Sequence, residues 1–308
     1  MKNRIVKRKA PRNSFQHIYK ITADRGTLFY RTLDHLVYYT IESVMSRRYN
    51  VRVLAACHMY NHTHKLSAPR DLQQMISCES NINIAFTREY NRECGRRGRL
   101  FQGPFGSAAK YTDKDKRSAL IYVMNNPVEK KLCTRAVDDR WTFLAYYEQD
   151  YPFSERPVLS RCRWALRDAM KMVEHEFHCG RYMRYALLHQ LFAGLGQLER
   201  EQLTDYILQL YFFFDREGCL ELFGSWDKMV EATDYSKGKE FDVGEDYEPF
   251  SDVPIREMCR IADHYKLLGP GLPLLHLPEN RKRHLAEMFR AQANADDVQI
   301  GRFFHQYP

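Results

Sequence analysis

The sequence predicts an α+β fold for the N-terminal half of this chain and a mostly α-helical C-terminal region. Up to about residue 130, short apolar, β-branched runs alternate with longer segments whose apolar residues recur at helical spacing. Beyond about residue 150 only the helical pattern recurs. A chain of 308 residues, 44% of them hydrophobic, is long enough to give both regions a core.

Seven segments make up the N-terminal region, in the order strand, helix, strand, strand, helix, strand, helix. They are residues 14–22, 34–49, 51–57, 62–68, 71–90, 100–110 and 113–126. The first strand alternates in polarity, and the first helix has apolar side chains at helical spacing from Leu36 to Met45. The next strand is an apolar, β-branched run, which we expect to pair with its successor across a short turn at Tyr60 and Asn61.

Cap and turn residues bound the last three of these segments. Asp71 is a candidate N-cap for the second helix, and Gly103-Pro104 breaks the fourth strand. We expect the third helix to end near Asn126, because a residue before proline disfavours the α conformation. This order is typical of the ferredoxin-like fold, an antiparallel sheet with helices on one face.

We predict three regions: a basic flexible arm at 1–13, a folded domain at 14–150 and a helical region at 151–308. In the last of these, helical patterns cover 166–177, 182–195 and 199–214, and an acidic, aromatic stretch at 235–254 is interpreted as a linker or long loop. Residues 283–305 have the pattern of a helix-turn-helix, with helices at 283–290 and 296–304 around a turn at 291–294. Either DNA reading or simple packing of a helical hairpin would produce that pattern.

Charge is distributed unevenly between the two halves. Residues 1–150 have 27 Lys and Arg against 14 Asp and Glu, a balance of +13, and the remainder has 20 against 25, a balance of −5. Basic clusters gain affinity for phosphates by releasing counterions, so the first half is predicted to bind a polyanion. Solubility is an alternative reason for a basic surface. Lys7, Arg8 and Lys9 in the arm are expected to add nonspecific affinity for DNA.

Several classes of protein are disfavoured by what the sequence does not contain. No apolar run approaches the roughly 20 residues of a membrane helix, so no membrane partner is expected. The basic start leads into no apolar segment of a secretory signal, which makes the cytoplasm the expected location. The eight cysteines include no CxxC pair, which argues against a zinc ribbon or a disulfide framework and favours reduced, mostly buried thiols.

Two pairs of residues are candidates for chemistry. His62 and His64 are two apart on a predicted strand, so both imidazoles face the same side and can share a metal ion. Tyr122 and Asn126 are four apart on a predicted helix, where a tyrosine can act as a nucleophile and an amide oxygen as a ligand. Taken alone, each pair has an ordinary alternative: a chance histidine pair, and a packed aromatic followed by a helix cap.

Three stretches in order resemble the HUH-type single-tyrosine transposases, closest to the insertion-sequence transposases and the REP-associated tyrosine transposases. They are VRVLAACHMYNHTHKL at 51–66, RGRLFQGPF at 97–105 and YVMNNPV at 122–128, followed by Trp141. The resemblance covers roughly residues 14–150. It implies a ferredoxin-like catalytic domain that cuts and rejoins single-stranded DNA, at hairpin or repeat ends, through a 5′-phosphotyrosine intermediate.

The resemblance also implies a role for each candidate residue. His62, His64 and Asn126 would hold a divalent ion, Mg²⁺ or Mn²⁺, and Tyr122 would be the nucleophile. A homodimer is compatible with it, in which Tyr122 acts either in its own chain or in the site of the partner.

Contacts with DNA are expected from the loop before the fourth strand. Arg96, Arg97 and Arg99 lie directly before Gln102 and can follow a phosphate backbone. Neighbouring aromatic residues are candidates for stacking on bases, or alternatively for the core of the domain. These are Tyr90, Phe101 and Phe105.

The sequence departs from the family pattern at Tyr60, Thr63 and Lys65, where proline, a large apolar residue and an apolar residue are usual. None of these changes removes a ligand or the nucleophile. They keep open the alternative of an inactive or domesticated DNA-binding regulator on the same scaffold. A replication or mobilisation nickase is less favoured, since we find one candidate tyrosine and no ATPase motif.

Overall fold

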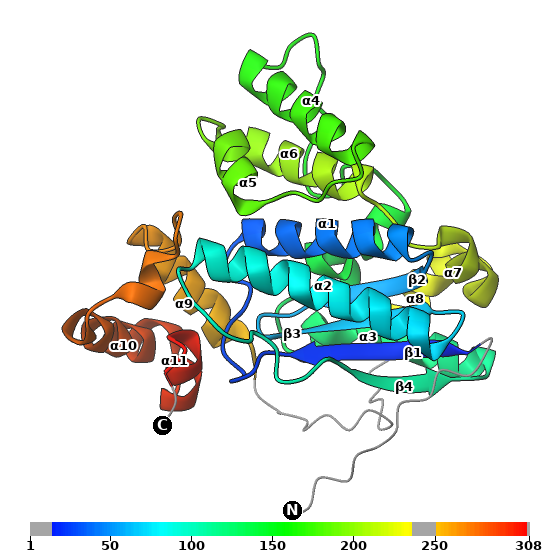
Figure 1. Cartoon of the computed structure of the whole chain (residues 1–308), viewed down its shortest axis with the longest axis horizontal. Helices are drawn as coiled ribbons and strands as arrows, with labels where there is room; N and C mark the ends of the chain where they lie inside the picture. Colours follow the sequence, from blue (N-terminus) through cyan, green and yellow to red (C-terminus); the bar gives the residue numbers. More distant parts are fainter. Residues whose placement is uncertain (1–13, 236–250, 307–308) are drawn as a thin grey trace, which may run out of the picture.

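The computed structural model describes residues 14–235 and 251–306. An antiparallel sheet of four strands lies at its centre, in the order β2-β3-β1-β4 (Figure 1). The strands are β1 Phe15–Ile21, β2 Arg52–His58, β3 His62–Ala68 and β4 Gly106–Lys110. Together with the helices between them, they confirm the predicted ferredoxin-like α+β fold.

Helices cover both faces of this sheet. α1 (Thr32–Arg48) and α2 (Leu72–Glu93) lie on one face, and α3 (Asp113–Glu129) lies on the other. The prediction that the helices cover one face only is therefore wrong for α3. The side chains of adjacent residues in β3 point to opposite faces of the sheet. Lys65 forms ion pairs with side chains of α1 and α2, whereas the ring of His64 packs against Tyr122 of α3.

Local capping explains where two of these helices begin. Asp71 is the N-cap of α2, as predicted, and its carboxylate accepts a hydrogen bond from the backbone N–H of Gln74. A capping box between Thr112 and Asp115 starts α3.

The predicted end of α3 at Asn126 is wrong, because the helix continues through Pro127 to Glu129. A proline this close to the last turn removes only one intrahelical hydrogen bond. The carbonyls of Asn126 and Pro127 accept hydrogen bonds from the N–H groups of Lys130 and Leu132, which closes the helix.

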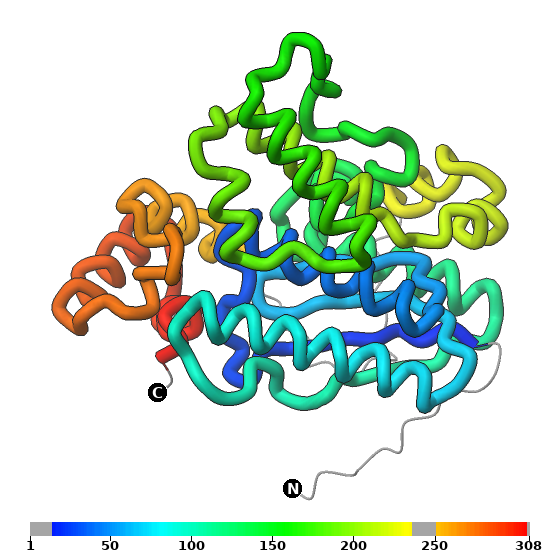
Figure 2. Tube along the Cα trace, turned by 45° about the horizontal axis from the view of Figure 1, so that its top comes forward, coloured from blue at the N-terminus to red at the C-terminus, as the bar shows by residue number. Residues whose placement is uncertain are grey.

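The C-terminal region is helical, as predicted. Its helices are α4 Trp164–His178, α5 Tyr185–Phe192, α6 Gln197–Leu210, α7 Arg216–Phe223, α8 Trp226–Tyr235, α9 Val253–His264, α10 Glu279–Ala293 and α11 Asp297–Phe303. α4, α5 and α6 lie together above α1, and α9, α10 and α11 gather at one end of the sheet (Figures 1 and 2). Of the predicted linker, 236–250 lies outside the described residues.

The helical pair near the C-terminus has different bounds from those predicted. The turn is at 294–296 rather than 291–294, because α10 continues to Ala293 and Asn294 ends it in the left-handed conformation. Asp296 then caps α11 by accepting from the N–H of Gln299. DNA reading by this pair stays a prediction.

One continuous cluster of buried apolar residues extends through both halves of the chain. Hydrogen bonds reinforce this packing: the Tyr39 hydroxyl donates to the carbonyl of Leu208 over 2.8 Å, and the Tyr30 hydroxyl to that of Phe303 over 2.6 Å. All eight cysteines are free thiols and five are buried, in agreement with prediction. Among the described helices, none combines the length and apolar character required to cross a bilayer.

Candidate metal and nucleophile site

The two histidines of β3 lie on the face of the sheet that α3 covers. Their ring centroids are 5.0 Å apart, as expected for residues two apart on a strand. β1 pairs with β3 so that Tyr19 is opposite His64 and Ile21 is opposite His62. This register also brings His17 of β1 onto the same face.

A hydrogen bond to the neighbouring Asn61 orients His62. The Asn61 amide group donates to the carbonyl of Arg25 over 3.1 Å, which directs its oxygen to His62 Nδ1 at 2.6 Å. An amide oxygen can only accept, so Nδ1 carries the proton and Nε2 is the basic nitrogen. A histidine oriented in this way is typical of metal ligands.

His64 is buried and contacts a third histidine. Its Nδ1 lies 3.1 Å from Nε2 of His17, which is also buried. Burial, followed by the nearby charge of Lys130, lowers the pKa of His64 to about 3, although a hydrogen bond with Asn126 opposes this shift. Burial also lowers the pKa of His17, and the charges of His64 and Lys110 add to that effect. Both imidazoles are therefore neutral near pH 7 and retain a basic nitrogen.

The helix α3 places its two candidate residues over these histidines. The Tyr122 ring lies edge-on to His64 and to His17, with centroids 5.4 Å from each. The amide group of Asn126 donates to the Tyr122 carbonyl over 2.8 Å, one helical turn back. All four sequence-predicted residues of the site are thus brought together by β3 and α3.

The donor set suits a divalent ion with several open coordination positions. Within 14–235 and 251–306, no three His, Cys, Asp or Glu side chains are arranged to hold a metal ion. A third protein ligand beside the two histidines of β3 would therefore be the amide oxygen of Asn126. Two imidazoles and an amide oxygen are neutral ligands that Mn²⁺ accepts readily and Mg²⁺ less so.

The residues predicted to contact DNA lie at the end of the sheet that carries His62. The N–H of Gln102 donates to the carbonyl of Ile21, which is opposite His62 in the sheet. Gln102, Arg97 and Arg99 are exposed, whereas Arg96 is half-buried and donates to the side chain of Asn91. Lys7, Arg8 and Lys9 lie outside the described residues.

The aromatic residues considered for stacking on bases belong to the core instead. Tyr90, Phe101 and Phe105 are all at most 5% exposed, so they cannot meet a base. Tyr19 is a better candidate, because it is half-buried and lies on the same face as His64. A side chain at Gly106 would collide with the Tyr19 ring, so this glycine lets the ring cross β4.

Two other features of the site were not predicted. His17 carries no spacing signal, since it is a single histidine on its strand and meets His64 only through strand pairing. Lys65, unusual at its position, points away from the site and pairs with Glu42 and Glu79. Thr63 likewise faces α1, where its hydroxyl lies 3.3 Å from that of Tyr38.

Comparison with known proteins gives one structural similarity and no sequence match. No protein-family model matches the chain, and no curated protein matches it significantly. A solved structure of a REP-associated tyrosine transposase bound to a REP hairpin is similar, with a TM-score of 0.39 and 19% identity. The match covers 45% of this chain and 81% of the transposase chain. At this level of similarity, function has to be argued from the site itself.

Proposed function

We propose that this protein is a metal-dependent, single-tyrosine enzyme that cuts and rejoins single-stranded DNA. The observation that carries the proposal is the convergence of a tyrosine, two histidines and an amide on one face of the sheet. The Tyr122 and His64 ring centroids are 5.4 Å apart, and those of His64 and His62 are 5.0 Å apart. A neutral His64 beside a tyrosine suits the transfer of a phosphodiester to the phenol.

His62, His64 and Asn126 would hold the divalent ion. When bound, such an ion neutralises the negative oxygens of the phosphodiester and orients the bond to be broken. Asn61 fixes the tautomer of His62, and the contact with His17 fixes the ring of His64. These contacts hold both rings on the face of the sheet that α3 covers.

Tyr122 would supply the attacking oxygen. Its hydroxyl oxygen bonds to phosphorus while the bond from phosphorus to the 3′ oxygen breaks. The phenol releases a proton and the departing 3′ oxygen takes one up, which leaves a 5′-phosphotyrosine and a free 3′-hydroxyl. The covalent intermediate retains the energy of the broken bond, so the reverse step on another end rejoins the strand without ATP.

The DNA is expected to reach this site along the exposed Arg97, Arg99 and Gln102. These residues lie at the end of β1 beside the strand that carries the histidines. Tyr19 offers a partly exposed ring there for an unpaired base. Hairpin or repeat ends that present single-stranded DNA are the substrates that we propose.

The test is a covalent adduct between protein and DNA. Purified protein is mixed with labelled, single-stranded hairpin DNA from its own flanking region, with Mn²⁺ or Mg²⁺ and then with EDTA. We expect a slowed protein band on a denaturing gel that needs the metal ion and disappears in Tyr122→Phe. The matched control is Tyr111→Phe, which alters an exposed tyrosine just before α3 and should leave the band unchanged.

The other outcomes also decide between functions. An adduct that persists in Tyr122→Phe would reject this tyrosine as the nucleophile. DNA binding without an adduct, on DNA that contains the true site, would favour a DNA-binding regulator on the same scaffold.

A further inference from the structure

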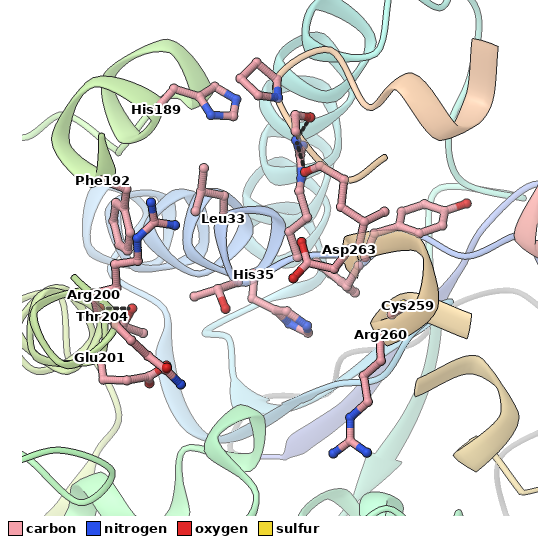
Figure 3. A pocket seen from close by; sticks show the side chains of 18 of the residues that line it. Leu33, His35, His189, Phe192, Arg200, Glu201, Thr204, Cys259, Arg260 and Asp263 are labelled. Atoms are coloured by element: carbon pink, nitrogen blue, oxygen red, sulfur yellow. Dashed lines mark hydrogen bonds between the residues drawn. The ribbon is translucent and has the colours of Figure 1, made fainter. Parts of the chain in front are cut away.

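A second cleft, separate from the histidine site, lies where the C-terminal helices meet the start of α1 (Figure 3). Its volume is about 1040 Å³. α5 and α6 border one side, α9 borders the other, and α1 lies between them. Ligand pockets for small molecules typically measure about 300–1,000 Å³, so a nucleotide-sized group has ample room.

The cleft also reaches the turn that leads into β3, the strand that carries His62 and His64. Tyr60, in the turn between β2 and β3, is one of its lining residues. The next residue, Asn61, orients His62. A strand of DNA held near His62 could therefore extend over a short path into this cleft.

A stack of flat rings contributes to the lining of the cleft. His35 lies between Phe29 and Trp141, with centroid distances of 4.4 and 3.9 Å and planes within 14° and 6° of parallel. Trp141 is half-buried and lines the cleft, so part of its indole ring is accessible to a ligand there. His35 is 6% exposed, and in the described part of the chain its Nδ1 has no hydrogen-bond partner. A buried polar atom of this kind calls for a partner.

Cationic side chains surround this stack from two sides. Arg200 belongs to α6, Arg256 and Arg260 are one turn apart on α9, and Lys266 follows that helix. Among the residues that the structure describes, neither Arg200 nor Lys266 forms an ion pair. Arg256 and Arg260 share the carboxylate of Glu257 on the same helix, and the side chain of Arg260 remains 68% exposed.

Acidic groups reduce this positive charge only in part. Of the two carboxylates in the lining, Glu201 is already paired with Arg140, and Asp263 is the other. The C-terminal region carries a balance of −5 overall, so a positive cleft within it is a local concentration of charge. Its chemistry suits an anionic ligand with a flat ring.

We propose that this cleft binds a nucleotide, whose base extends the stack of Trp141 on His35 and whose phosphate is held by the two arginines of α9, Arg256 and Arg260. An unpaired nucleotide within a DNA strand and a free nucleoside monophosphate share this chemistry. The proposal goes beyond strand cutting and does not depend on it, because no residue of the cleft belongs to the metal and nucleophile site.

The test compares two probes on the full-length protein. Fluorescein-labelled (dA)12 is titrated by fluorescence anisotropy, and dAMP by calorimetry. The informative variant is Arg260→Glu, and its matched control is Arg156→Glu, which reverses a similarly exposed arginine outside the cleft. We expect Arg260→Glu to weaken binding about fivefold at low salt and to lower the salt dependence of the (dA)12 affinity, with little change in the control.

A second pair of variants tests the stacking. Trp141→Ala should weaken binding of the same probes about fivefold or more, and Trp141→Phe, which keeps a flat ring, should restore most of the affinity. Thermal melts of both variants check that the fold is retained. Because Arg260 is exposed, Arg260→Glu is expected to fold. It therefore tests binding to the cleft even if Trp141→Ala unfolds.

The two probes identify the source of the nucleotide. Losses for (dA)12 alone indicate a DNA strand, and losses that include dAMP indicate a site for a free nucleotide. Wild-type affinity of Arg260→Glu and folded Trp141→Ala for both probes would overturn the proposal. Tyr122→Phe should keep wild-type affinity for dAMP, so failure of the cutting reaction and failure of this cleft are distinguishable.

Discussion

The two faces of the central sheet bury polar side chains in opposite ways. Under α1 and α2, Lys65 lies 2.7 Å from Glu79 and 3.2 Å from Glu42. Lys20 lies 2.9 Å from Glu79, so each buried charge has a counter-charge. Under α3 the polar groups are His17, His62, His64, Tyr122 and Asn126. The buried imidazoles of His17 and His64 are neutral near pH 7, and an amide fixes the position of the ring proton of His62.

The two faces therefore have different roles: one stabilises the fold, and the other offers groups that can take part in a reaction. Burial raises the pKa of Glu42, but Lys65 and then His58 outweigh it and lower that pKa to about 2, so the carboxylate stays charged. Burial lowers the pKa of His64 to about 3, so its imidazole stays neutral. Compensated charges fix the two helices on the sheet, whereas neutral nitrogens remain able to coordinate a metal ion.

The largest expected effect is the loss of a counter-charge on the helical face. Glu79→Gln leaves Lys20 and Lys65 buried with one fewer carboxylate, and breaking a buried ion pair costs about 3–5 kcal/mol. We expect a loss of that size in the free energy of unfolding, measured by urea denaturation. Glu257→Gln, which breaks a pair with the exposed Arg260, should cost at most about 1 kcal/mol. Equal losses in both variants would show that burial does not set the strength of these pairs.

The next effect concerns the histidine that the sequence did not reveal. His17→Phe keeps a flat ring but removes the contact with His64, and outer contacts of this kind change metal affinity about 10- to 100-fold. We expect Mn²⁺ binding to weaken by that factor in calorimetry. His58→Phe is the matched control on the opposite face: it should lower stability through Glu42 and leave Mn²⁺ affinity unchanged. Unchanged Mn²⁺ affinity in His17→Phe would remove His17 from the site.

A smaller effect is a difference between the two faces in how the free energy of unfolding depends on pH. His64 takes up a proton below about pH 6.5 in the unfolded chain but only near pH 3 in the folded protein. Because the unfolded state binds this proton more tightly, the free energy of unfolding decreases as the pH falls from about 6.5 toward 3. Glu42 contributes stability that is present above about 4.5 and lost as pH falls toward 2. Lowering the pH from 7 to 5 should therefore reduce the free energy of unfolding of the wild type. In His64→Gln the same change of pH should reduce it by about 2 kcal/mol less.

Urea denaturation at several pH values measures this difference. Glu79→Gln, on the other face, removes a carboxylate that pairs with Lys20 and Lys65 rather than with a histidine, so it should leave the slope between pH 7 and 5 as it is in the wild type. Identical slopes in His64→Gln and the wild type would mean that the folded protein accepts the proton at His64 without cost.

The smallest effect belongs to the exposed loop beside the site. Arg99→Ala removes one exposed charge, so we expect no change in stability and a slope of log Kd against log salt that is smaller by about 1 for single-stranded DNA. Fluorescence anisotropy at several salt concentrations measures it. A salt dependence equal to that of the wild type would place the DNA path elsewhere.

Much of the N-terminal fold could be predicted because its signals are local. Alternation, helical spacing and the cap at Asp71 depend on residues close in sequence, and each of these strands and helices is present. The fourth strand is shorter than predicted: it is Gly106–Lys110 rather than 100–110, and before it Phe101 forms only an isolated bridge with Thr22. The end of α3 was missed because Pro127 sits where little of the helix remains to be disrupted. α7, α8 and α9 were not predicted. The first two residues of α9, Val253 and Pro254, were assigned to the linker, since a proline is compatible both with a loop and with the start of a helix.

By itself, the sequence determined the spacing of the site: two histidines on one strand and a tyrosine one turn from an asparagine on one helix. Fixed backbone periodicity makes those pairs face the same way. Only the tertiary structure decided that His17, 47 residues from His64, meets it across β1 and β3. It also decided that Lys65 is neutralised by two helices and that Trp141 meets His35 beside a basic cleft. Such contacts depend on which strands pair and which helices pack, and no local pattern encodes that choice.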